Sequence, residues 1–191
     1  MGAIESTDVL RRHRLTVAQY QRMGEAGVLG PDDRVELIEG ELVDMAPMKS
    51  RHASVVGRLV DACSRMPAGR ALVWCQLPLH LDDHSEPEPD LMLLRPRDDF
   101  YATAHPVPAD VLLLVEVSES TARYDREIKV PLYARHGVPE VWVVDLDERT
   151  LRIYGAPLAG AYTRVSATTT PGVLAPALLP ELRIDLAPLL R

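Results

Sequence analysis

The chain has 191 residues, of which 47% are hydrophobic and 26% charged, a composition typical of globular proteins. Its formal net charge of −7 counts against a surface that binds nucleic acid over its whole area, because such surfaces are basic. No apolar run is long enough to span a bilayer, and the N-terminal stretch MGAIESTDVLRRHRL lacks the apolar core of a secretory signal. We therefore expect a cytoplasmic protein with no membrane partner, folded as one domain over residues 1–191.

Hydrophobic periodicity in the first part of the chain indicates two helices separated by a hairpin. Thr16 is the expected N-cap of the first helix and Ser50 that of the second, and Gly40 is the expected turn of the hairpin. The predicted elements are a helix within 16–29, a hairpin over 34–45 and a helix over 50–66.

The rest of the chain predicts strands around one central helix. The run VLLLVEVSE is the strongest strand, and its unbroken apolar start indicates burial on both faces. Pro131 lies inside the predicted helix, so the helix either kinks there or becomes regular close to it. We expect the proline-rich tail from residue 171 to pack over a sheet edge. The predicted elements are strands at 70–82 (interrupted), 90–94, 111–119, 139–147, 149–155 and 161–167, and a helix at 120–137.

These elements predict a mixed α/β domain. The strand at 111–119, the helix after it and the strand at 139–147 form a β-α-β unit, with antiparallel strands around it. The expected architecture is a central mixed sheet flanked by helices.

Two carboxylates in this sheet are candidates for metal binding. Asp90 opens one strand, and Glu116 lies within the buried strand, on the predicted face of Leu112, Leu114 and Ser118. Neighbouring strands lie about 4.8 Å apart, so the two carboxylates can share one small cation. Mg²⁺ takes one or two carboxylates together with water and substrate phosphate.

Lys129 is the candidate cation of the same site, and Glu36 in the hairpin is a further candidate carboxylate. The chain has 21 basic residues, of which only Lys49 and Lys129 are lysines. A lysine ammonium is a compact charge that arginine does not replace. The helix that follows Glu116 returns across the sheet, so Lys129 is able to reach the end of that strand and stabilise developing negative charge.

Each candidate also has a purely structural interpretation. Glu116 could form a buried ion pair with an arginine, and Asp90 could simply begin a strand. Glu36 could face solvent, with Glu39 or Glu41 serving instead, and Lys129 could pair with Asp125 on its own helix.

Two other polar groups are weaker candidates. His52 opens a predicted helix, where a capping or core role is favoured over catalysis. His80, Asp82, Asp83, His84, Glu86 and Glu88 are crowded, but their loop setting and irregular spacing favour a solvated segment over a metal site.

The order of motifs resembles a known family. RVELIEGELVDMAP, SRH at a helix start, PEPDLML, LLVEVSEST, YDREIKVPLYARHGVPEVWVVD and LRIY occur in sequence. Together they resemble a bacterial family of restriction-endonuclease-like proteins within the PD-(D/E)XK nuclease superfamily. The resemblance covers a core of about residues 15–187, and it implies a restriction-endonuclease-like fold and Mg²⁺-dependent phosphodiester hydrolysis.

The resemblance also assigns roles to the candidate residues. Asp90 matches the aspartate of the PD element, Glu116 matches the acidic residue of the (D/E)XK element, and Glu36 matches the early acidic residue in ELIEG. Ser118 stands where the superfamily usually has its lysine. In this family the basic residue is on the following helix, where Lys129 matches it.

The leading hypothesis is a DNA endonuclease in which Asp90 and Glu116 bind Mg²⁺ or Mn²⁺. Glu36 and Lys129 complete the catalytic group. Because cutting both strands of a duplex commonly needs two active sites, we expect a homodimer. The alternative is a catalytically inactive module that keeps the fold for interaction or dimerisation, and a third hypothesis is a nuclease acting on RNA or branched DNA.

Overall fold

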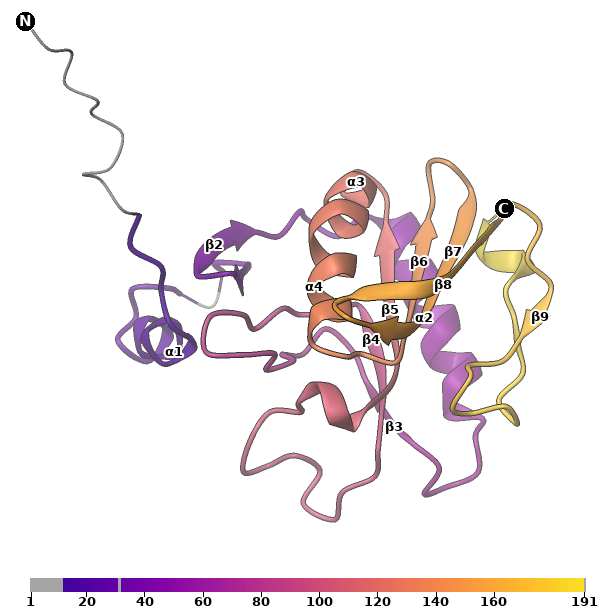
Figure 1. Ribbon diagram of the computed structural model, residues 1–191, viewed down its shortest axis with the longest axis horizontal. Helices are drawn as coiled ribbons and strands as arrows, with labels where there is room; N and C mark the ends of the chain where they lie inside the picture. Colours follow the sequence, from indigo (N-terminus) through magenta and orange to yellow (C-terminus); the bar gives the residue numbers. More distant parts are fainter. Residues whose placement is uncertain (1–11, 31, 191) are drawn as a thin grey trace, which may run out of the picture.

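The computed structural model describes residues 12–30 and 32–190, and a six-stranded mixed sheet forms its centre (Figure 1). The strand order is β3-β4-β5-β6-β7-β8. Within this sheet only β5 and β6 run parallel, and every other neighbouring pair is antiparallel. The predicted mixed α/β architecture is confirmed. The strands are β3 (Leu72–Trp74), β4 (Leu91–Leu94), β5 (Val111–Ser118), β6 (Glu140–Asp145), β7 (Thr150–Leu158) and β8 (Ala161–Thr168).

Strands β5 and β6 are buried along their whole length, as their aliphatic runs predicted. On β5, Val115 and Val117 face one apolar cluster, and Leu114 faces another on the opposite side of the sheet. Leu112 packs with the cluster of Val115, not with Leu114, so its predicted face was wrong. The β4–β5 register shifts between Leu93 and Leu94, and such a bulge interrupts the alternation on which the prediction rested.

One face of the sheet is covered by α2 (Ser50–Ser64) together with the C-terminal tail. The tail carries the short pair β9 (Val173–Leu174) and β10 (Ile184–Asp185), and ends in a 3₁₀ turn. We expected it to pack over a sheet edge, and that prediction was wrong. Leu179, Leu182 and Leu186 join the same core as α2 and β5, because a run so rich in leucine gains more from burial on a face.

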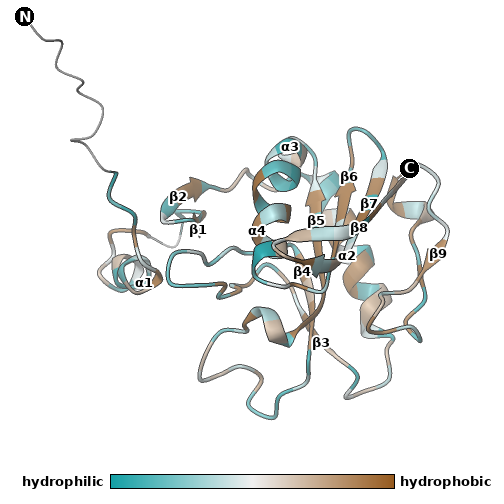
Figure 2. Cartoon of the chain, viewed as in Figure 1, coloured by the Kyte–Doolittle hydropathy of each residue, from teal (hydrophilic) through white to brown (hydrophobic). Residues whose placement is uncertain are grey.

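The opposite face is covered by α3 (Ala122–Tyr124) and α4 (Val130–Arg135). A π-helical turn joins them over Asp125–Lys129. Pro131 lies in the first turn of α4, where its missing N–H costs little. Of the two alternatives for this helix, the regular part therefore starts at the proline. Figure 2 shows the apolar residues concentrated in the central strands that lie between these two helical layers.

A separate unit near the N-terminus consists of α1 (Val17–Glu25) and the hairpin of β1 (Val35–Ile38) and β2 (Glu41–Asp44). Thr16 caps α1 as predicted, in a capping box with Gln19. The hairpin is tied to the loop before β4, where the N–H of Glu86 donates to the carbonyl of Leu37 at 2.8 Å. This contact holds β1 beside the end of β5.

Gly40 sets the hairpin turn, and its replacement by alanine should lower the free energy of unfolding. Its φ is +80°, and a Cβ there would lie 2.5 Å from the Cβ of Arg14. Gly27→Ala is the matched control, because Gly27 has φ +70° with nothing within 4 Å of a built Cβ. Left-handed strain costs about 1–2 kcal/mol in both variants, so urea unfolding should show a clearly larger loss for Gly40→Ala. Equal losses would contradict this account.

Candidate active site

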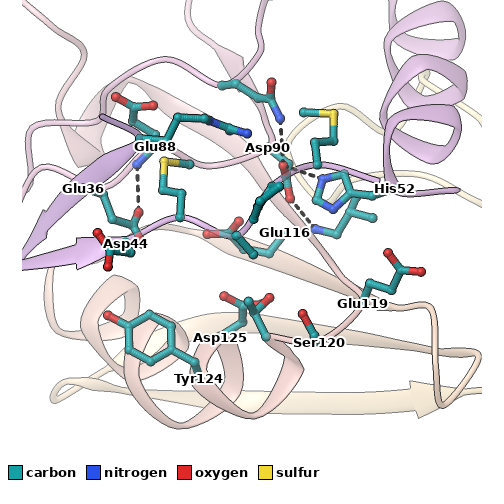
Figure 3. A pocket seen from close by; sticks show the side chains of 18 of the residues that line it. Glu36, Asp44, His52, Glu88, Asp90, Glu116, Glu119, Ser120, Tyr124 and Asp125 are labelled. Carbon is teal, nitrogen blue, oxygen red and sulfur yellow. Dashed lines mark hydrogen bonds and ion pairs between the residues drawn. The ribbon is translucent and has the colours of Figure 1, made fainter. Parts of the chain in front are cut away.

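The carboxyl end of β5 opens into a cavity of about 560 Å³. The hairpin, the start of α2 and the helical layer of α3 provide its other walls (Figure 3). Ligand sites in proteins usually occupy roughly 300–1,000 Å³. All four predicted catalytic residues line this cavity: Glu36, Asp90, Glu116 and Lys129.

Glu116 projects from β5 toward the helical layer, and only 3% of it is exposed. Its Oε1 accepts hydrogen bonds from the Tyr133 hydroxyl at 2.6 Å and the Lys129 ammonium at 3.3 Å. An arginine partner was the structural alternative for this carboxylate. Its basic partner in the structure is the predicted lysine.

Lys129 lies between two carboxylates at the end of the π-helical turn. Its Nζ is 3.0 Å from Oε2 of Glu36 and 3.3 Å from Oε1 of Glu116. A π-turn is wider than an α-turn and is often found at functional sites. The helix thus brings Lys129 to the end of β5, where the strand itself carries Ser118.

Glu36 is the hairpin carboxylate that reaches the cavity. It is buried on β1, and its Oε2 also accepts the N–H of Glu88 at 3.2 Å. Glu39 has φ +49° at the turn and pairs with Arg135 on the outside at 2.7 Å. Glu41 is likewise exposed on the hairpin. The structure therefore favours Glu36 over its two neighbours as a site residue.

Asp90 lies just before β4 and contacts three groups. Its Oδ2 accepts the N–H of Val117 at 2.8 Å, and its Oδ1 lies 2.8 Å from Nε2 of His52 and 3.2 Å from Nε2 of Gln76. The Val117 bond holds Asp90 next to Glu116 on the neighbouring strand. A capping or core role was favoured for His52, and that prediction was wrong: His52 does not cap α2, and its ring contacts Asp90 instead. The N-cap of α2 is Lys49, so the predicted cap at Ser50 was also wrong.

Asp125 was not recognised as a site residue from the sequence. It is buried at the start of the π-turn, and its Oδ2 accepts hydrogen bonds from Ser118 Oγ at 2.6 Å and Thr121 Oγ1 at 2.8 Å. Ser118 therefore anchors the helix that carries Lys129 to the strand that carries Glu116. A serine two residues after Glu116 and an aspartate four residues before Lys129 were the signals available.

Burial dominates the electrostatics of the site. It raises the pKa of Glu116 to about 8, although Lys129 opposes the shift. Burial also raises the pKa of Asp125. Burial lowers the pKa of Lys129, but the negative charges of Glu116 and Glu36 outweigh that effect, and the net shift is upward. The ammonium consequently stays protonated at neutral pH. The hydrogen bond with Asp90 raises the pKa of His52.

The carboxylate oxygens fit the ligand preference of Mg²⁺ or Mn²⁺, with Asp90 and Glu116 as the candidate ligands. A carboxylate offers about four lone-pair sites. In residues 12–30 and 32–190, the hydrogen bonds to Glu116 both end on Oε1, which leaves Oε2 for a ligand. In this range no group of three or more His, Cys, Asp or Glu side chains is placed to hold a metal ion together. Mg²⁺ usually keeps several waters and needs only one or two carboxylates, so an open two-carboxylate site fits it.

The crowded loop of histidines and acids forms ion pairs and turn contacts. His80 Nδ1 lies 3.5 Å from Glu86, and Asp82 lies 3.0 Å from Nε2 of His136. The ring of His84 contacts the carbonyl of Leu15 at 2.8 Å. The solvated setting expected for this segment is wrong at Glu86, which is 3% exposed, and at Glu88, which lines the cavity.

The mixed sheet, with helices on both faces, places the chain in the α/β class. A sequence model of the Uma2 family, described as "Putative restriction endonuclease", matches residues 17–187. The chain therefore belongs to this family, as its motifs indicated. A comparison with curated proteins gave no match.

Among solved structures, the chain is similar to a protein from Anabaena variabilis ATCC 29413 described as "a putative nuclease". The TM-score is 0.70, with 17% identity over 92% of this chain and 97% of that one. At this identity the likeness establishes a shared fold alone. In the part of the chain that the structure describes, no helix combines the length and apolar character needed to cross a membrane.

Glu116→Gln should change how stability depends on pH. Burial raises the folded-state pKa of Glu116 from its ordinary value of 4.5 to about 8. The folded protein binds more protons between these values, and wild-type stability falls as pH rises through them. Glutamine does not titrate, so the variant should gain stability relative to wild type between about pH 5 and about pH 8. Urea unfolding at both pH values tests this, and an unchanged difference would contradict it.

Proposed function

We propose that the protein is a metal-dependent endonuclease that hydrolyses phosphodiester bonds of DNA. The observation that carries the proposal is the contact of Lys129 with both Glu116 and Glu36, beside Asp90, in one cavity. Membership of a family described as "Putative restriction endonuclease" supports the same proposal.

Asp90 and Glu116 would hold Mg²⁺ or Mn²⁺ at the end of β5. A bound divalent cation polarises the phosphate and lowers the pKa of a bound water. In the reaction the water oxygen forms a bond to phosphorus while one phosphorus–oxygen bond to a sugar breaks. The departing sugar oxygen takes up a proton, which leaves a phosphate monoester and a hydroxyl end.

Lys129 acts as an electrostatic group in this proposal. Its raised pKa keeps it charged, so it is suited to stabilising negative charge and unsuited to removing a proton from water. Glu36 keeps the ammonium in place from the side of the hairpin at 3.0 Å. Tyr133 holds Glu116 and His52 holds Asp90 by a hydrogen bond to each carboxylate.

Glu116→Gln should abolish Mg²⁺-dependent cleavage and leave the fold intact, because the amide retains an oxygen that accepts from Tyr133. Glu119→Gln is the matched control. Glu119 lines the same cavity but pairs with Lys49 at 3.7 Å and is not a proposed ligand. Nicking of supercoiled plasmid measures activity, and circular dichroism measures folding. Unchanged cleavage by Glu116→Gln would overturn the assignment.

A catalytically inactive interaction module is the second candidate. The observation that favours it is that both carboxylate oxygens of Asp90 already have protein partners. Oδ1 contacts His52 and Gln76, and Oδ2 accepts the N–H of Val117. A homodimer is compatible with either function.

Calorimetric titration with Mg²⁺ and Mn²⁺ distinguishes the two candidates. The endonuclease should bind cation in wild-type form and lose that binding in Asp90→Asn, which removes the charge and keeps the shape. Glu119→Gln should bind as wild type does. Absence of binding together with absence of nicking would favour the inactive module.

A further inference from the structure

The reacting groups lie deep in the molecule. The exposed fractions are 3% for Glu36, 3% for Glu116, 6% for Lys129 and 9% for Asp90. A scissile phosphate must therefore enter the cavity and cannot react at its rim. A base-paired duplex is wide and stiff. Its backbone therefore cannot bring one phosphate into the cavity without bringing the second strand against the protein as well.

The cavity has the size and the walls of a site for one nucleotide. Its volume is about 560 Å³. The segment between β2 and α2 supplies an apolar wall that includes Met45, Pro47 and Met48, and Tyr124 on α3 provides an aromatic ring. Figure 3 shows Tyr124 on the helical side of the cavity, across from Glu36 and Asp44 of the hairpin. Aromatic rings stack on bases of any sequence, and methionine adapts to flat apolar partners.

The charges around the cavity also disfavour a continuous duplex. Among the described residues that line the cavity, Arg34 and Lys49 are the arginine and lysine side chains besides Lys129, which is already engaged by two carboxylates. His52 also lines the cavity, where it is paired with Asp90. Duplex binding draws its affinity from many phosphate contacts to lysine and arginine. Two cations suit the few phosphates that flank a single unpaired nucleotide. The carboxylates that line the cavity are Glu36, Asp44, Glu88, Asp90, Glu116, Glu119 and Asp125.

We propose that the substrate is an unpaired DNA strand, taken up one nucleotide at a time with its base between Tyr124 and the Met45–Met48 wall. The phosphate then reaches Asp90 and Glu116 on the floor, and Arg34 and Lys49 contact the neighbouring phosphates. This inference rests on the proposed endonuclease function and leaves its bond changes unaltered. It restricts the substrate to single strands, unpaired bubbles and frayed ends.

Cleavage of matched oligonucleotides with Mn²⁺ tests the substrate class. One labelled sequence is presented as a single strand, as a perfect duplex and as a duplex with a central unpaired bubble. We expect cuts in the single strand and inside the bubble, at least about tenfold faster than in the duplex, a ratio equal to 1.4 kcal/mol in activation free energy. Equal rates on duplex and unpaired DNA would overturn the inference and leave the endonuclease proposal standing. Absence of cleavage on all three would overturn both.

Variants of the wall test where the base binds. Tyr124→Ala should raise KM for the single strand, and Tyr124→Phe, which keeps the ring, should restore it. Met48→Ala provides a second test on a segment outside any helix or strand, should Tyr124→Ala fail to fold. Leu158→Ala is the surface control, because Leu158 is 70% exposed and does not line the cavity.

Binding gives a readout that is independent of cleavage. A single strand containing 2-aminopurine is mixed with wild-type protein in Ca²⁺, and stacking of the base quenches its fluorescence. Quenching should be lost in Tyr124→Ala and retained in Tyr124→Phe and Leu158→Ala. Unchanged quenching and KM in both Tyr124→Ala and Met48→Ala would overturn the assignment of this wall to the base.

Discussion

The structure depends on one buried ammonium held between two carboxylates. Lys129 comes from the helical layer, Glu116 from the sheet and Glu36 from the hairpin, and each is nearly inaccessible to solvent. Burying charges is costly unless geometry and hydrogen bonds compensate for lost hydration. Here the compensation requires all three elements to be docked. The positions of the hairpin, the central strand and the π-turn are therefore linked through one group of charges.

The link between Ser118 and Asp125 explains how this chain brings Lys129 from a helix to the end of β5. The serine on β5 holds the first residue of the π-turn, and the lysine lies at the last residue of that same turn. A lysine two residues after Glu116 would project from the strand itself. The helical position needs an extra contact to fix its direction, and the Ser118–Asp125 hydrogen bond supplies that contact.

The sequence predicted those features that follow from local pattern. Aliphatic runs identified β5 and β6, and Pro131 limited the start of α4. The choice between Glu36 and Glu39 stayed open. The alternation of side chains along a strand assigns residues to the two faces of the hairpin, but it does not show which face the rest of the chain covers. The contact of His52 with Asp90 was not predicted, because the two residues are 38 positions apart in the sequence. The tail was misplaced because its leucines have no period that identifies a packing surface.

The π-turn has a consequence for how the molecule responds to motion. Because Lys129 belongs to the helical layer and Asp90 and Glu116 belong to the sheet, loosening the segment from Ala122 to Arg135 would withdraw the ammonium from Glu116. Local opening of this kind costs less than global unfolding. The position of the Lys129 ammonium therefore depends on how stably the segment from Ala122 to Arg135 packs against the sheet. Withdrawal of that helix would leave Glu116 and Glu36 without the ammonium that lies between them.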